Sequence, residues 1–175
     1  MSTYSPAERI RANIQDLFQA NLAPGDPYIR FKLTSDITAL LSMDRVQNSI
    51  IIDADKITPI PGMPESVIGI MSSRDRVFCV FDLARLLEIT SETVARRQYQ
   101  ILILQTDIEP HVNIGLAVTE LQGILRKTSA EIQSVPSNVN ASLTPYLKGA
   151  VIEQQEIIPI LEFDYILQTL TTAKQ

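Results

Sequence analysis

The chain repeats its own pattern of apolar residues, and this repeat restricts the folds that it can adopt. An offset of 80 residues places segment 67–87 on segment 147–167 without a gap. An offset of 75 residues places segment 39–50 on segment 114–125. Because the two offsets differ, the second copy has a longer loop between its matching parts. Two copies of one unit in a single chain predict a protein with two similar lobes.

The repeated unit has the pattern of short β-strands. Residues 28–34 alternate strictly, with Ile29, Phe31 and Leu33 on one face. Further strand-like runs follow, and each copy ends in a helical turn. A five-stranded sheet alone exposes its edges and buries little, whereas curling into a small barrel removes the edges. We therefore predict a mainly β protein in which two such barrels share one larger core.

A helix is expected before the repeat. Residues 6–22 carry an apolar stripe at helical spacing, and the Pro- and Gly-rich segment 23–27 ends it. This helix either covers the core or docks a partner. A short C-terminal helix is expected at 164–170. The predicted divisions are 1–27 for the N-terminal helix and linker, 28–170 for the β domain, about 28–90 for lobe one and about 99–170 for lobe two.

Composition restricts the partners and the location. The formal net charge of -5 argues against nucleic acid, because phosphate binding needs clustered cations. No apolar run reaches the roughly 20 residues that span a bilayer, and the N-terminus has no secretory signal. We expect a cytoplasmic protein without direct membrane insertion. Cys79 is the only cysteine and lies in an apolar run, so a buried, inert thiol is expected.

No set of residues points to catalysis. The sequence has no GxxxxGK and no GxGxxG motif, and its one histidine, His111, lacks a partner at ligand or dyad spacing. Asp82 and Glu162 are equivalent in the repeat, and both resemble the acids that begin helices. The sequence therefore predicts no enzyme, no cofactor and no metal.

Residues from Tyr28 to about Leu167 resemble the CheW family, the scaffold proteins of bacterial chemotaxis arrays, with PilI-type relatives. No single motif carries the resemblance, but the ordered set does. The matching segments are 46–49, 59–61, 69–75, 77–83, 114–118, Gly149 and 157–161.

The resemblance implies two intertwined five-stranded Src-homology-3-like β-barrels and no catalysis. It also implies an adaptor that couples a methyl-accepting chemoreceptor, or a related receptor, to the regulatory domain of a CheA-type histidine kinase. The output would be chemotaxis, phototaxis or type IV pilus (twitching) motility. This chain has Asn48 where the family has an acid, and Asp75 where it has glycine. The alternative is therefore a diverged interaction module that serves another kinase or regulatory complex and has lost receptor binding.

The charged segment 74–76, between two apolar runs, is either a plain hairpin tip or a contact site. As a contact site, Arg74 would donate several hydrogen bonds to a partner carboxylate or carbonyl groups. The resemblance places a bent strand near this turn. The candidate partner-binding residues are Val46, Gln47, Asn48, Arg74 and Asp75.

Overall fold

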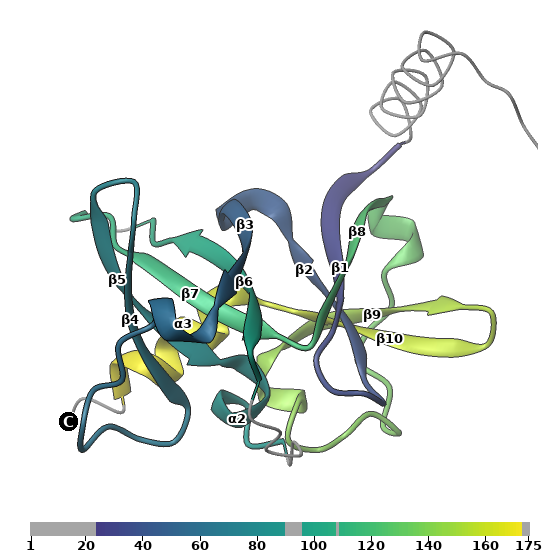
Figure 1. Ribbon diagram of the computed structural model, residues 1–175. Helices are drawn as coiled ribbons and strands as arrows, with labels where there is room; N and C mark the ends of the chain where they lie inside the picture. Colours follow the sequence, from purple (N-terminus) through teal and green to yellow (C-terminus); the bar gives the residue numbers. More distant parts are fainter. Residues whose placement is uncertain (1–23, 90–95, 108, 173–175) are drawn as a thin grey trace, which may run out of the picture.

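A computed structural model describes residues 24–89, 96–107 and 109–172, which form two five-stranded sheets with few helices (Figure 1). The strands of sheet A are β1 (Asp26–Lys32), β2 (Thr38–Ser42), β8 (Glu120–Lys127), β9 (Leu147–Glu153) and β10 (Glu156–Leu161). The strands of sheet B are β3 (Val46–Asp53), β4 (Val67–Ser73), β5 (Arg76–Asp82), β6 (Gln98–Gln105) and β7 (Asn113–Val118).

The helical elements are short and lie between or after the strands. They are η1 (Met43–Arg45), η2 (Ala54–Lys56), α2 (Leu83–Leu86), η3 (Ser129–Glu131), η4 (Thr144–Tyr146) and α3 (Phe163–Thr172). The predicted C-terminal helix corresponds to α3. Asp82 caps α2 by accepting a hydrogen bond from the backbone N–H of Arg85 at 3.2 Å, which agrees with its expected position at a helix start. The helix predicted at 6–22 lies outside the described residues.

The repeat is present in the sheet topology. Sheet A has the order β8-β1-β2-β10-β9 and sheet B the order β3-β6-β7-β5-β4. If each strand of the first half is replaced by the strand five places later, and each strand of the second half by the strand five places earlier, the order of sheet A becomes the order of sheet B. Each sheet therefore contains strands from both halves of the sequence, and the sheets do not coincide with the predicted lobes 28–90 and 99–170. The chain changes sheets at η1, between β2 and β3, and again between β7 and β8.

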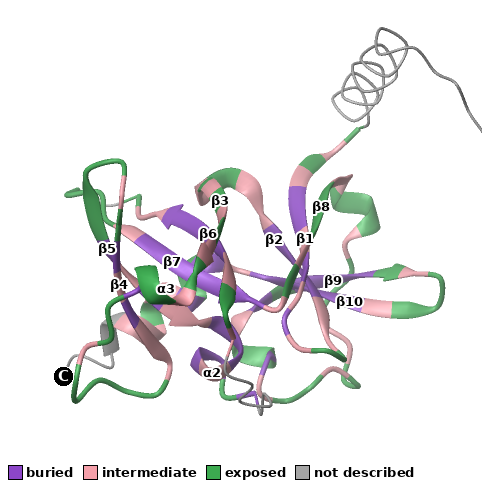
Figure 2. Ribbon diagram, in the orientation of Figure 1, coloured by how far each residue is buried: buried purple, intermediate pink, exposed green. Residues whose placement is uncertain are grey.

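Apolar side chains fill three regions, and the largest of them lies between the sheets. This central core includes Phe31 from sheet A and Leu102 and Leu104 from sheet B, all with 0% exposure. A second cluster surrounds Val80 in sheet B, and a third surrounds Ile160 in sheet A. Figure 2 shows the buried residues concentrated where the two sheets meet. The prediction of two β units with one shared larger core is confirmed, while closure into Src-homology-3-like barrels stays a prediction.

Two glycines that match in the repeat occupy equivalent backbone crossings. A Cβ atom at Gly149 would lie 2.6 Å from the carbonyl oxygen of Gln133, and one at Gly69 would collide with the carbonyl oxygen of Thr58. The residue after each glycine pairs with the crossing segment in an isolated antiparallel bridge. Ile70 pairs with Thr58, and Ala150 pairs with Gln133. Glycine recurs because only it leaves room for the crossing backbone.

Candidate functional site

The β4–β5 turn is a tight two-residue hairpin with charged side chains. Ser73 and Arg76 are cross-strand partners, and the chain reverses through Arg74 at φ 50° and Asp75 at φ 63°. Left-handed conformations at both positions match the twist of antiparallel strands. Aspartate tolerates this conformation better than most residues, so Asp75 forms the turn where the resembled family has glycine.

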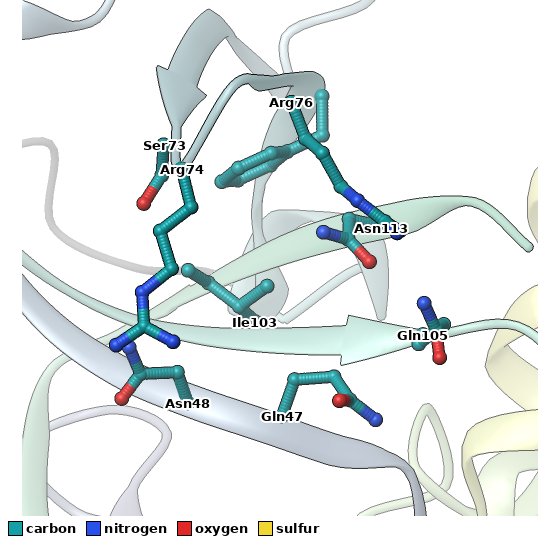
Figure 3. Close-up of a pocket in the computed structure, with 9 residues that line it drawn as sticks. Gln47, Asn48, Ser73, Arg74, Arg76, Ile103, Gln105 and Asn113 are labelled. Atoms are coloured by element: carbon teal, nitrogen blue, oxygen red, sulfur yellow. The ribbon is translucent and has the colours of Figure 1, made fainter.

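A cavity of about 190 Å³ lies beside this hairpin (Figure 3). All five strands of sheet B, together with the turn, supply its lining, so the sheet is strongly curved around it. Phe78 and Ile103, both 4% exposed, provide the apolar part of the lining. The polar lining residues are Gln47, Asn48, Ser73, Arg74, Arg76, Gln105 and Asn113.

A β-bulge brings two successive residues of β3 to this cavity. Val46 pairs with Leu104 and Asn48 with Ile103, so Gln47 is the extra residue on its strand. In a regular strand, neighbouring side chains point to opposite faces. A bulge re-aims side chains locally, and here both Gln47 and Asn48 line the cavity.

The cavity presents positive charge and donors, together with one buried acceptor, Asn113 Oδ1, that has no hydrogen-bond partner among the described residues. Figure 3 shows the Arg74 side chain directed toward Asn48, with the Asn48 amide nitrogen on the side of the guanidinium group. The Asn48 Oδ1 atom already accepts a hydrogen bond from the backbone N–H of Ser49 at 2.9 Å. Among the described residues, neither Arg74 nor Arg76 has a carboxylate oxygen within 4.0 Å. The cavity lining thus contains two arginines and no acidic residue.

The structure brings together three of the five predicted site residues, namely Gln47, Asn48 and Arg74. Val46 instead packs against the central core, and Asp75 lies exposed at the turn outside the cavity lining.

Sequence reasoning missed four polar lining residues. Ser73 and Arg76 flank the predicted turn, so their positions beside it could have been found from the sequence. Gln105 and Asn113 reach the cavity because they pair across β6 and β7, and this pairing left no local signal.

The equivalent hairpin of sheet A, β9–β10, has the same shape but different chemistry. Gln154 and Gln155 occupy the turn at φ 48° and 67°. Glu153, which matches Ser73 in the repeat, accepts a hydrogen bond from Arg30 Nη1 at 2.6 Å and forms an ion pair with Lys127 Nζ at 2.8 Å. The positive charges near this hairpin are therefore neutralised within the chain.

These contacts shift two pKa values. The hydrogen bond from Lys127, with a further one from Arg30, holds the pKa of Glu153 below its ordinary value. The hydrogen bond to Glu153 raises the pKa of Lys127 above its ordinary value. Both groups are therefore charged over a wider pH range than usual, which is typical of a structural ion pair.

Other site chemistry is not found in the described residues. No group of three or more His, Cys, Asp and Glu side chains there is arranged to bind a metal ion. The Cys79 thiol is partly buried, which is less than the full burial expected. Within the same residues, no helix combines the length and apolarity that a bilayer crossing requires.

Comparisons with known proteins agree on one family. Residues 27–171 match the family described as CheW-like domain. The chemotaxis protein CheW of Thermotoga maritima is 27% identical over 131 residues, which are 75% of this chain and 82% of that protein. The chemotaxis protein CheW of Bacillus subtilis is 24% identical over 112 residues, or 64% and 69% of the two chains.

A solved structure has the same fold. The crystal structure of the scaffolding protein TtCheW from Thermoanaerobacter tengcongensis superposes with a TM-score of 0.66. The match covers 79% of this chain and 89% of that one at 20% sequence identity. At this identity the likeness supports the fold alone.

Proposed function

The chain belongs to the CheW-like family of chemotaxis scaffold proteins, and we propose that it couples chemoreceptors to a CheA-type histidine kinase without catalysing a reaction. The proposed partners are the regulatory domain of the kinase and the cytoplasmic part of a methyl-accepting chemoreceptor or related receptor. These partners place the protein in the cytoplasm. The signalling output is chemotaxis, phototaxis or type IV pilus motility.

The observation that carries this proposal is the cavity beside the β4–β5 hairpin. It contains two arginines without a carboxylate partner among the described residues, and such groups suit contact with another protein. Gln47, Asn48 and Arg74 contact the partner directly in this proposal. Asp75 lies at the rim, and Val46 anchors the bulge by packing on the central core.

The fold suits an adaptor because its two halves present separate surfaces. The β4–β5 and β9–β10 hairpins lie at opposite ends of the molecule in Figure 1. We propose that each curved sheet is a barrel of the Src-homology-3 type, since each surrounds an apolar cluster of its own. Two such units, with different charges at equivalent hairpins, can hold two different proteins at once.

Arg74→Glu tests the proposal. Binding of the purified kinase regulatory domain, and of a receptor cytoplasmic fragment from the same cell, is measured by calorimetry. We expect Arg74→Glu to abolish binding of at least one fragment and to leave the melting temperature within a few degrees, because Arg74 is exposed. Lys56→Glu, at an exposed residue of η2, changes the net charge equally and should leave binding unchanged.

If Arg74→Glu binds both fragments as tightly as the unaltered protein does, the cavity beside the β4–β5 hairpin is not the docking surface. If the unaltered protein binds the kinase fragment but no receptor fragment, the alternative holds, and the chain is a diverged module that has lost receptor binding.

A further inference from the structure

Among the described residues, no carboxylate lies within 4.0 Å of Arg74 on its side of the cavity. Arg74 carries only donors, and the Asn48 amide oxygen points away from Arg74 and accepts a hydrogen bond from the backbone N–H of Ser49. The amide nitrogen of Asn48 and the guanidinium group of Arg74 therefore face each other as two donors (Figure 3). An acceptor between them would satisfy both, and a carboxylate has enough lone pairs to do so.

The chain itself shows how a carboxylate fits such a place. At the equivalent hairpin of sheet A, Glu153 accepts from Arg30 and Lys127. The matching residue of sheet B is Ser73, which lines the cavity directly opposite Arg76 in the β4–β5 pairing. The hairpin of sheet A thus supplies an acid that pairs with cations of β1 and β8, whereas the hairpin of sheet B brings two arginines to a cavity whose lining contains no acid.

Acidic residues near the cavity do not fill this role. Asp75 is exposed at the turn and outside the lining. Glu109 borders an adjoining hollow with Arg76, but its carboxylate lies 2.9 Å from His111 Nε2. The cavity is also a local positive site on a chain whose net charge is -5. A negative partner group is therefore attracted to this place in particular.

The surroundings indicate that the negative group belongs to a protein. The adjoining hollow, of about 490 Å³, shares Arg76 and Asn113 with the cavity and includes Val77 and Val112. These valines are 70% and 50% exposed. A free anion would gain nothing from them, whereas a partner chain would bury them beside its acidic residue.

We propose that the cavity of sheet B receives an Asp or Glu side chain of the partner protein, which Arg74 and Arg76 bind, while an apolar partner residue covers Val77 and Val112. The partner carboxylate then replaces the internal acid that Glu153 provides in sheet A. This inference rests on the proposed function and specifies the chemistry of its docking surface.

Ser73→Glu provides the test, because it places an internal acid where the partner's acid would bind. The probe is whichever fragment Arg74→Glu releases, the kinase regulatory domain or the receptor cytoplasmic fragment. We expect Ser73→Glu to weaken its binding by about tenfold or more, since the new carboxylate both occupies the arginines and repels the partner's acid. Gln155→Glu, at the exposed turn of the other hairpin, adds the same charge and should change binding less than about twofold.

A second arm identifies the partner's acid. Each Asp and Glu of the fragment is changed to Lys and tested against Arg74→Glu, and one of these reversals should restore binding. The carboxylate inference is overturned if Ser73→Glu binds as tightly as Gln155→Glu, or if no reversal restores binding. In that event a loss of binding by Arg74→Glu still supports the docking surface. If Arg74→Glu also binds both fragments normally, the surface and the inference fall together.

A folding defect in Ser73→Glu does not remove the test. Arg74→Gln combined with Arg76→Gln removes the positive charge without adding a negative one. The double variant should bind more weakly and with a smaller dependence on salt concentration than the unaltered protein. An unchanged salt dependence would contradict recognition of a carboxylate.

Discussion

Replacing Glu153 by glutamine should destabilise the protein by removing the charge that holds together β1, β8 and β9. Glu153 lies 2.6 Å from Arg30 Nη1 and 2.8 Å from Lys127 Nζ, and the three side chains are 28%, 32% and 17% exposed. Hydrogen bonds to charged groups contribute about 1.5–3 kcal/mol, whereas fully exposed ion pairs contribute about 0.2–1 kcal/mol. Because these contacts lie between those limits and glutamine keeps one acceptor, we expect a loss of about 1–2 kcal/mol at pH 7.

The effect should depend on pH in a definite direction. The pKa of Glu153 is lower in the folded protein than its ordinary value of 4.5. Its stabilising contribution is therefore complete above that ordinary value and is lost as the pH falls through the folded-state pKa. The pKa of Lys127 is raised, so its contribution is complete below 10.5 and is lost only as the pH rises through the folded value. The gap between the unaltered protein and Glu153→Gln should be constant from about pH 6 to 9 and should shrink in acid.

Urea unfolding at pH 7 and pH 3 measures this gap, and thermal unfolding at pH 7 should show a decrease of roughly 2–8 °C for a chain of this length. Glu156→Gln is the matched control. Glu156 is the cross-strand partner of Glu153, is exposed, and forms no ion pair with another described residue. An equal gap at both pH values, or an equal loss from the control, would refute the electrostatic reasoning.

Two further predictions concern the core and the turn. Leu102→Ala removes a side chain with 0% exposure from the central core and should lower the free energy of unfolding by about 3 kcal/mol in urea, whereas Ile51→Ala, at a residue 67% exposed, should change it by less than about 0.5 kcal/mol. Asp75→Gly relieves a left-handed residue at φ 63° and should raise the free energy of unfolding by about 0.5 kcal/mol. A decrease measured by the same method would show that the Asp75 side chain stabilises the turn.

The sequence predicted the strands well because their patterns are local. The strand expected at 28–34 overlaps β1, which spans Asp26–Lys32. The repeat predicted two equivalent units because matching positions face matching constraints. Gly69 and Gly149, for example, both leave room for a crossing backbone.

The exchange of strands between the sheets could not be read from local patterns. The pairing of β1 with β8 joins residues far apart in the chain, and no single segment records its partner. The same limit applies to the cavity. Arg74 and Asn48 were placed together through the resemblance, whereas Gln105 and Asn113 depend on the pairing of β6 with β7. Val46 was assigned to the surface because strand alternation cannot show which face meets the central core.

The exchanged strands also affect how the chain completes its fold during synthesis. β2 pairs in parallel with β10, so Leu40 of β2 cannot pair until its partner Ile160 has left the ribosome. At about 5–20 residues per second, those roughly 120 residues take about 6–24 s. During this interval an edge of β2 is unpaired and open to pairing with another chain. Sheet A cannot finish before β10 is made, and sheet B needs β6 and β7 from the second half, so the first half cannot mature as an independent folding unit.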